Sequence, residues 1–143
     1  MPRQAVARID FVIDTNVVFY YLLKVDPFWP QIRALLQRAG RIVAPASWEA
    51  EIVSALWKAV EHGMLERDEA LGKIGVLDSF KVESVAVRSL WSKAFVLATQ
   101  HRHSPHDTLY VALAQRLNRV LVTYDERLQS LFPDLAVSPE IVL

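Results

Sequence analysis

The sequence predicts a three-layer α/β/α sandwich with a short central parallel sheet of four to five strands. Short apolar segments of strand length alternate with helical segments along the whole chain. This alternation is typical of parallel strands joined by right-handed crossover helices. The chain has 143 residues, of which 52% are hydrophobic, which suits one substantial core and excludes a disordered or fibrous protein. We therefore expect residues 1–143 to form a single domain.

The first predicted strand, residues 9–13, organises the chain. Its β-branched and aromatic residues are typical of a buried strand, and the strand ends on the carboxylate of Asp14. Ser47 is a favoured N-cap for a long helix. The other expected elements of the first half are helices at 17–24 and 28–38, a strand at 41–45 and the helix from Ser47 to His62.

The second half of the chain continues the alternation. Ser104 is a predicted N-cap, with Pro105 at the first helical position, where proline is favoured. The expected elements are a helix at 67–77, a strand at 80–85, a helix at 87–100, a loop at 101–106, a helix opened by residues 104–107 that ends at Asn118, a strand at 120–123, a last helix at 125–132 and an edge strand at 136–137.

The composition excludes several classes of site. There is no cysteine, so the chain has no disulfide framework, thiolate metal site or cysteine nucleophile. The 16 basic and 16 acidic residues balance, so any contact with nucleic acid must come from a local patch. No apolar stretch reaches the length of a membrane span, and residues 1–8 lack the core of a signal peptide. We expect a cytoplasmic protein without membrane contact.

Four acidic residues fall at one edge of the predicted sheet: Asp14 after the first strand, Glu51 early in the helix after the second, Asp107 opening its helix and Asp125 after the fourth strand. The carboxyl ends of parallel strands share the edge where open α/β sheets bind ligands. Four carboxylates in one crevice repel one another unless a cation lies among them, and oxygen ligands suit Mg²⁺ or Mn²⁺. The pattern predicts a divalent metal site and phosphodiester hydrolysis.

Each of these acids also has a structural interpretation, because carboxylates are favoured at helix N-caps and in first turns. Together, however, the structural interpretations require four coincidences at one sheet edge. In these interpretations Asp14 is an N-cap and Glu51 is a solvated residue of a first helical turn. Asp107 completes an N-terminal capping box with Ser104, and Asp125 lies beside the capping box of Thr123 and Glu126. The acids not assigned to the metal are Asp10, Glu49 and Glu126.

Four segments that span nearly the whole chain carry a family resemblance: FVIDTN at 11–16, EIVSAL at 51–56, HDTLYVALA at 106–114 and LVTYDERL at 121–128. In order and spacing they resemble the PIN-domain family and, within it, the small VapC-type toxins of toxin–antitoxin pairs. Ser54 departs from that pattern, since many relatives carry asparagine there, and about eight residues precede the usual start. Neither departure removes an expected ligand.

The resemblance implies a metal-dependent endoribonuclease with one or two Mg²⁺ or Mn²⁺ ions. It also implies a homodimer and a cognate VapB-type antitoxin that grips the early helices. The four tryptophans agree with this, because they suggest more apolar surface than one core needs. The implied ligands are Asp14, Glu51, Asp107 and Asp125, with Thr15, Asn16 and Thr123 at supporting positions.

RNA beside a carboxylate site requires positive charge at the rim, and the expected contacts are Arg102, His106 and Arg127. His101 and His103 are expected in a solvated loop, because loop histidines lack the paired helical spacing of a Zn²⁺ motif. Three alternatives stay open: a non-catalytic protein-binding module, a PIN nuclease that acts in RNA processing rather than as a toxin, and an aspartyl-phosphate phosphatase. The last is weaker, because residues 14–16 lack the second nearby aspartate of that nucleophile loop.

Overall fold

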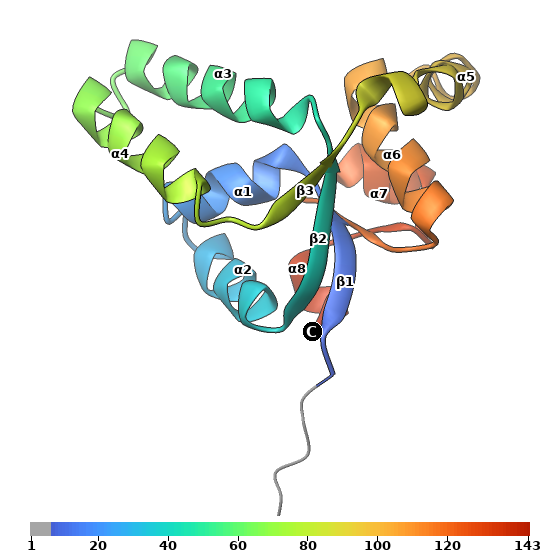
Figure 1. The fold of residues 1–143 in the computed structure, drawn as a ribbon, viewed down its shortest axis with the longest axis horizontal. Helices are drawn as coiled ribbons and strands as arrows, with labels where there is room; N and C mark the ends of the chain where they lie inside the picture. Colours follow the sequence, from blue (N-terminus) through green and yellow to red (C-terminus); the bar gives the residue numbers. More distant parts are fainter. Residues whose placement is uncertain (1–6) are drawn as a thin grey trace, which may run out of the picture.

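A computed structural model describes residues 7–143, and a five-stranded parallel sheet lies at its centre (Figure 1). The strand order is β3-β2-β1-β4-β5. Helices cover the sheet on both sides, so the predicted α/β/α architecture is confirmed. The strands are β1 (Ile9–Ile13), β2 (Ala39–Pro45), β3 (Val82–Val85), β4 (Leu121–Val122) and β5 (Ala136–Val137).

The strand order reverses at β1, which pairs with β2 on one edge and with β4 on the other. The first three strands extend the sheet in one direction, and β4 and β5 then extend it in the other. Open α/β sheets bind ligands outside the carboxyl ends of the strands at such a reversal. The fold therefore marks the ends of β1 and β4 as the place for a site.

The helices form two groups beside the central strands: α1 to α4 lie on one side of β1 and β2, and α5 to α7 lie on the other (Figure 1). No helix within residues 7–143 combines the length and apolarity needed to cross a bilayer. The helices are α1 (Thr15–Leu22), α2 (Phe28–Gln37), α3 (Trp48–Glu61), α4 (Arg67–Leu77), the 3₁₀ helix η1 (Val87–Ser89), α5 (Trp91–His101), α6 (Pro105–Leu117), α7 (Glu126–Leu131) and α8 (Pro139–Val142).

Strand β1 and helix α6 form the centre of the core. Phe11 and Val12 of β1 and Val111 and Leu113 of α6 are fully buried. A central strand has neighbours on both edges and helices on both faces, so its residues are apolar on both faces. Burial of this kind makes the ends of β1 and α6 rigid supports for the side chains that extend from them.

Most predicted elements are confirmed within a few residues, and α4 has the predicted bounds. The first helix begins at Thr15 rather than residue 17, because Asp14 caps it by accepting a hydrogen bond from the Thr15 N–H. The loop predicted at 101–106 is shorter, since α5 continues to His101 and α6 begins at Pro105. Ser47 occupies the predicted N-cap of α3, but its hydroxyl makes no capping bond.

Two helix predictions were wrong. The helix expected at 87–100 is divided into η1 and α5, because Leu90 closes a 3₁₀ turn through its N–H to the Val87 carbonyl. The helix at 125–132 is not the last one, since α8 follows β5. Helix α8 begins with Ser138 and Pro139, the same start signal that located α6, and it was missed because it has only 4 residues.

Candidate metal centre

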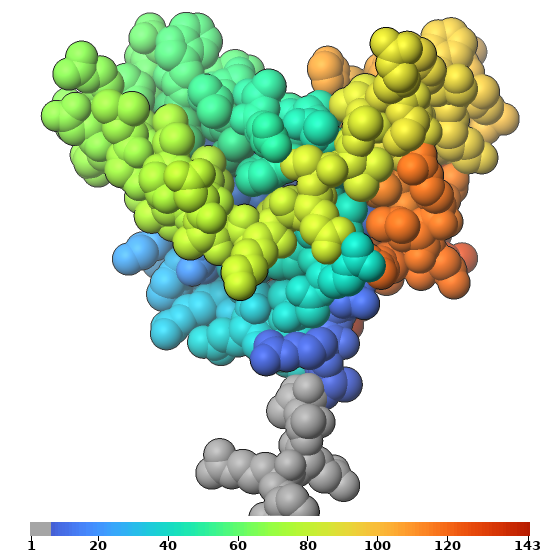
Figure 2. Space-filling view, viewed as in Figure 1, coloured from blue at the N-terminus to red at the C-terminus, as the bar shows by residue number. Residues whose placement is uncertain are grey.

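The four predicted acids gather at the carboxyl edge of the sheet, beside the reversal of strand order. Asp14 follows β1, Asp125 follows β4, and Glu51 and Asp107 lie in the first turns of α3 and α6. The negative charges of Asp107 and Glu51 act on Asp14, and those of Asp125 and Glu51 act on Asp107. Figure 2 shows a notch in the surface between α3 (green) and α5 (yellow) at this end of the molecule.

Asp14 is the most deeply buried of these acids, with 6% of its surface exposed. Its Oδ1 accepts a hydrogen bond from the Thr15 N–H at 2.7 Å, and its Oδ2 accepts one from the Thr123 hydroxyl at 2.7 Å. Burial raises its pKa to about 7, and the charges of Asp107 and Glu51 act in the same direction, while the two hydrogen bonds oppose the shift. Asp14 therefore caps α1 and also carries an unfavourable buried charge.

The supporting residues predicted around Asp14 lie in contact with it or with one another. Asn16 donates from its side-chain amide to the Thr123 hydroxyl at 3.3 Å and accepts from the Tyr124 N–H at 3.3 Å. Thr123 is fully buried, and its oxygen accepts from the Asp125 N–H at 3.0 Å. These bonds tie the end of β1 to the end of β4, which fixes Asp14 relative to Asp125.

Glu51 is held through one oxygen only. Its Oε2 accepts from the Thr15 hydroxyl at 2.8 Å and from the Tyr110 hydroxyl at 2.9 Å. Its Oε1 is buried and has no hydrogen-bond partner among residues 7–143. A buried carboxylate oxygen without a partner is costly, and a cation would satisfy it.

The contact of Tyr110 with Glu51 was not predicted from the sequence. Tyr110 lies on a helix whose neighbouring residues are almost all apolar, so it is indistinguishable from a core aromatic. Burial raises the pKa of its hydroxyl, so the side chain stays protonated and remains a hydrogen-bond donor.

His103 contacts Asp107, which contradicts the expectation that it lies in a solvated loop. Its Nε2 lies 2.8 Å from Asp107 Oδ2, and its side chain is 7% exposed. The chain turns inward here because Arg102 adopts a left-handed backbone with φ of 51°. Burial raises the pKa of Asp107, and His103 opposes this shift. Asp107 thus bonds to His103, and Ser104 alone caps α6 by accepting from the His106 N–H.

Asp125 is the N-cap of α7, whereas the sequence analysis placed it beside a Thr123–Glu126 box. Its Oδ1 accepts from the N–H groups of Arg127 and Leu128 at 2.9 and 3.1 Å. Negative charge at this position is also favoured by the helix dipole. The capping bonds leave Oδ2 free, so a structural role and a ligand role are compatible in the same carboxylate.

The carboxylates share one pattern that suits a divalent cation. In Glu51, Asp107 and Asp125, one oxygen accepts hydrogen bonds from the protein and the other accepts none among residues 7–143. One atom each from His103, Asp107 and Asp125 lies within 4.8 Å of the others. Mg²⁺ and Mn²⁺ prefer oxygen ligands, and Mg²⁺ needs near-octahedral geometry. The residues present therefore fit such an ion.

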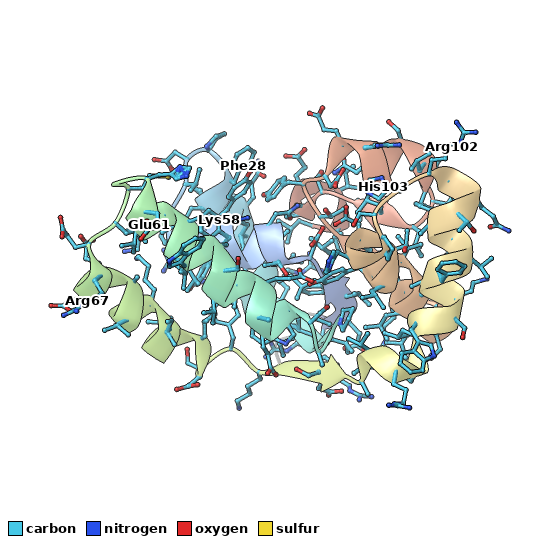
Figure 3. The ribbon with its side chains drawn as sticks, turned by 90° about the horizontal axis from the view of Figure 1, so that it is seen from above. Phe28, Lys58, Glu61, Arg67, Arg102 and His103 are labelled. Atoms are coloured by element: carbon cyan, nitrogen blue, oxygen red, sulfur yellow. The ribbon has the colours of Figure 1, made fainter. Side chains whose placement is uncertain are left out.

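Positively charged side chains flank the acids. Arg102 and Arg127 are exposed, and Arg127 donates to the Arg102 carbonyl at 2.9 Å. His106 and Lys58 line an open pocket together with Glu51 and Ser54. In the view from above, Lys58 extends from α3, and Arg102 and His103 lie on the opposite side of the molecule's midline (Figure 3). Lys58 was not predicted, because one exposed lysine on a helix carries no signal of its own.

Sequence comparisons connect the chain with known proteins. The PIN domain family model matches residues 11–132. Ribonuclease VapC3 of Pyrobaculum aerophilum is 37% identical over 89 residues, an alignment that covers 59% of this chain and 66% of that protein. Ribonuclease VapC3 of Mycobacterium tuberculosis is 30% identical over 122 residues, covering 85% of this chain and 87% of that protein. The chain thus spans just under two thirds of the first relative and most of the second.

Structure comparisons find the same fold. VapBC2 from Rickettsia felis, bound to a DNA fragment from its promoter, matches with a TM-score of 0.64 and 17% identity, covering 91% of this chain and 98% of that chain. A toxin–antitoxin complex from Klebsiella pneumoniae matches with a TM-score of 0.62 and 14% identity, covering 90% and 97%. FitAcB from Neisseria gonorrhoeae matches with a TM-score of 0.61 and 17% identity, covering 91% and 98%.

The raised pKa of Asp14 predicts how the stability of the metal-free protein depends on pH. Its pKa is about 7 in the folded state and 3.8 in its ordinary state. The folded protein therefore holds a proton that the unfolded chain releases between these values. The contribution of Asp14 to the free energy of unfolding is therefore greatest below about pH 4 and is lost as the pH rises from about 4 to 7. We expect the Tm of the metal-free protein to fall between about pH 5 and 8, measured by thermal denaturation.

The matched variant for this measurement is Asp14→Asn, which keeps the shape of the side chain but does not titrate. It should flatten the pH dependence. Added Mn²⁺ should raise the Tm of the wild type more at the higher pH, where the carboxylate is charged. Equal pH profiles for the wild type and Asp14→Asn would contradict this account.

Proposed function

The chain belongs to the PIN-domain family, and from that premise we propose that it is a metal-dependent endoribonuclease that hydrolyses RNA phosphodiester bonds as the toxin of a toxin–antitoxin pair. The observation that supports this most strongly is the convergence of four carboxylates, three of which have an oxygen that accepts no hydrogen bond from the described residues. Two relatives carry the name ribonuclease VapC3. The structural matches include a toxin–antitoxin complex.

In this proposal Asp14, Glu51, Asp107 and Asp125 hold Mg²⁺ or Mn²⁺. When bound, such an ion would stabilise charge on a phosphoryl oxygen and make water a better nucleophile. The chain's own groups keep the ligands in place. Tyr110 and Thr15 hold Glu51 by donating to its Oε2, and the Thr123 hydroxyl holds Asp14. Preorganisation of this kind lowers the cost of reaching the reactive geometry.

Substitution of the proposed ligands tests the activity directly. We expect Asp14→Asn and Glu51→Gln each to lower the rate of RNA cleavage by at least ~100-fold, because each removes a negative charge from the centre. Cleavage of a labelled single-stranded RNA in Mn²⁺ or Mg²⁺ measures this. The control is Glu61→Gln, at the other end of the same helix α3, which should cleave at the wild-type rate (Figure 3).

Cleavage that persists in Asp14→Asn, or in excess chelator, would contradict the mechanism. A wild-type chain that cleaves no RNA and binds no divalent ion would instead favour the non-catalytic protein-binding module. Cleavage restricted to precursor RNAs, without any growth arrest on expression, would favour a role in RNA processing.

We assign contact with the RNA backbone to Arg102, His106 and Arg127, with Lys58 on the facing helix. The arginines are exposed beside the acids, and His106 shares an open pocket with Lys58. Positive charge at the rim attracts the phosphate backbone toward an anionic centre that would otherwise repel it. These residues thus offset the repulsion between the carboxylates and the substrate.

Arginine substitutions test this assignment through the salt dependence of binding. Arg102→Gln and Arg127→Gln should weaken binding of single-stranded RNA whatever its sequence, and each should reduce the slope of log affinity against log salt by roughly 0.7. Fluorescence anisotropy in Ca²⁺ at several salt concentrations measures the slope. Arg67→Gln, on the distant helix α4, is the control and should leave the slope unchanged. Unchanged slopes in both site variants would remove these residues from the RNA path.

We assign two exposed apolar patches to protein partners. Trp57 is 60% exposed and Phe95 is 64% exposed, which is unusual for aromatic side chains with no partner to cover them. We assign the α3–α4 patch to a VapB-type antitoxin and the α5 patch to a second copy of the chain. The α3–α4 patch consists of Val53, Trp57, Met64, Leu71 and Val76, and the α5 patch consists of Trp91, Phe95 and Val96.

Two single substitutions distinguish the patches. Trp57→Asp should weaken the complex with the co-expressed antitoxin by about 30-fold or more, because a tryptophan that becomes buried when the complex forms is a typical interface anchor. It should leave the homodimer intact, whereas Phe95→Asp should do the reverse. Light scattering and calorimetry measure the two equilibria. A wild-type chain that is monomeric at micromolar concentration and binds no product of a neighbouring gene would contradict both assignments.

A further inference from the structure

The imidazole of His103 lies among the proposed metal ligands, and its role there has two possible forms. Its Nε2 lies 2.8 Å from Asp107 Oδ2, and one of its ring nitrogens lies within 4.8 Å of an oxygen of Asp125. Its Nδ1 is buried and has no hydrogen-bond partner among residues 7–143. His103 could bind the cation through Nε2, or it could donate a hydrogen bond from Nε2 to Asp107.

The buried Nδ1 atom distinguishes these two forms. If Nε2 bound a cation, its lone pair would point at the metal and the ring proton would lie on Nδ1. That N–H would then be a buried donor without an acceptor, whereas histidines that bind metals almost always donate their other N–H to a partner. On the protein backbone, orphaned buried N–H groups are rarer than under-satisfied acceptors. With the proton on Nε2, Nδ1 is a buried acceptor without a donor among the described residues, which is the less costly of the two cases, and the ring donates to Asp107 Oδ2 at 2.8 Å.

We propose that His103 is a positioning residue. It carries its proton on Nε2, and this N–H donates a hydrogen bond to Asp107 Oδ2, so that Oδ1 of Asp107 is presented to the cation. His103 itself does not bind the cation. This inference rests on the proposed function to the extent that Asp107 is a metal ligand.

The local backbone is built to hold the imidazole in this place. Helix α5 ends at His101, the left-handed Arg102 reverses the chain, and the His103 N–H donates to the Ala98 carbonyl at 3.2 Å. Asp107 lies beyond the corner, in the first turn of α6. The side-chain bond therefore joins the end of α5 to the start of α6. It also restrains a carboxylate that would otherwise rotate, since the Asp107 side chain is 35% exposed.

The same arrangement occurs at Glu51 and Asp125, each of which, within the described residues, has fixed donors on one oxygen only. Thr15 and Tyr110 hold Glu51, and the first N–H groups of α7 hold Asp125. His103 is the corresponding donor for Asp107. An outer donor of this kind fixes the direction of a ligand and tunes its affinity for the metal without contacting it.

The test compares Mn²⁺ affinity in His103→Leu, which removes the donor, with His103→Gln, whose amide N–H extends to a similar distance. Loss of an outer-shell partner typically costs about 10- to 100-fold in metal affinity. We expect that loss in His103→Leu and recovery of most of it in His103→Gln, measured by electron paramagnetic resonance of free and bound Mn²⁺. His62→Leu, an exposed histidine at the end of α3, is the matched control and should bind as the wild type does.

Two spectroscopic measurements on the wild type complete the test and do not depend on whether a variant folds. In the Mn²⁺-loaded protein, pulsed resonance should show no directly coordinated histidine nitrogen. In the metal-free protein labelled with ¹⁵N-histidine, nuclear magnetic resonance should show the proton of His103 on Nε2. A coordinated nitrogen, a proton on Nδ1, or wild-type affinity in folded His103→Leu would each overturn the inference.

These readouts separate the inference from the proposed function, because none of them uses RNA cleavage. Wild-type protein that shows the expected affinities and tautomer but cleaves no RNA would support the role of His103 and contradict the nuclease assignment. Wild-type protein that binds no Mn²⁺ would overturn both.

Discussion

Electrostatic repulsion among four carboxylates at one edge of the sheet is the constraint on which the rest of the structure depends. Asp14 is buried beside the charges of Asp107 and Glu51, and Glu51 keeps a buried oxygen for which residues 7–143 supply no hydrogen-bond partner. This arrangement lowers the stability of the metal-free fold. The apolar burial around β1 and α6 offsets this loss of stability. The site is therefore costly to fold without a cation and suited to bind one.

The acids reach this edge because each follows a strand or opens a helix, and they stabilise the fold there as well. Asp14 caps α1 and Asp125 caps α7, each through its own carboxylate oxygen. In Asp125 the capping bonds leave the second oxygen free within residues 7–143, so capping and metal binding are compatible in one carboxylate. In Asp14 the second oxygen also accepts a hydrogen bond, from the Thr123 hydroxyl, so the direction of the whole carboxylate is fixed.

Much of the fold could be predicted from the sequence, because apolar periodicity and start signals such as Ser104–Pro105 are local properties. The positions of Asp14 and Asp125 followed from the same logic, since parallel strands share a carboxyl edge. His103 could not be predicted, because its inward position depends on the left-handed backbone of Arg102, a non-glycine residue. Tyr110 was missed for another reason: its hydroxyl contact depends on tertiary packing, and its helical spacing is that of a core residue.

The central claim is that acids distant in sequence surround one cation, and diffraction tests it most directly. Crystals grown or soaked in Mn²⁺ should be measured at a wavelength where manganese scatters anomalously. The account predicts an anomalous peak at the carboxyl edge of the sheet, among the carboxylates of Asp14, Glu51, Asp107 and Asp125. A peak at another surface, or none at this edge at saturating Mn²⁺, would contradict it.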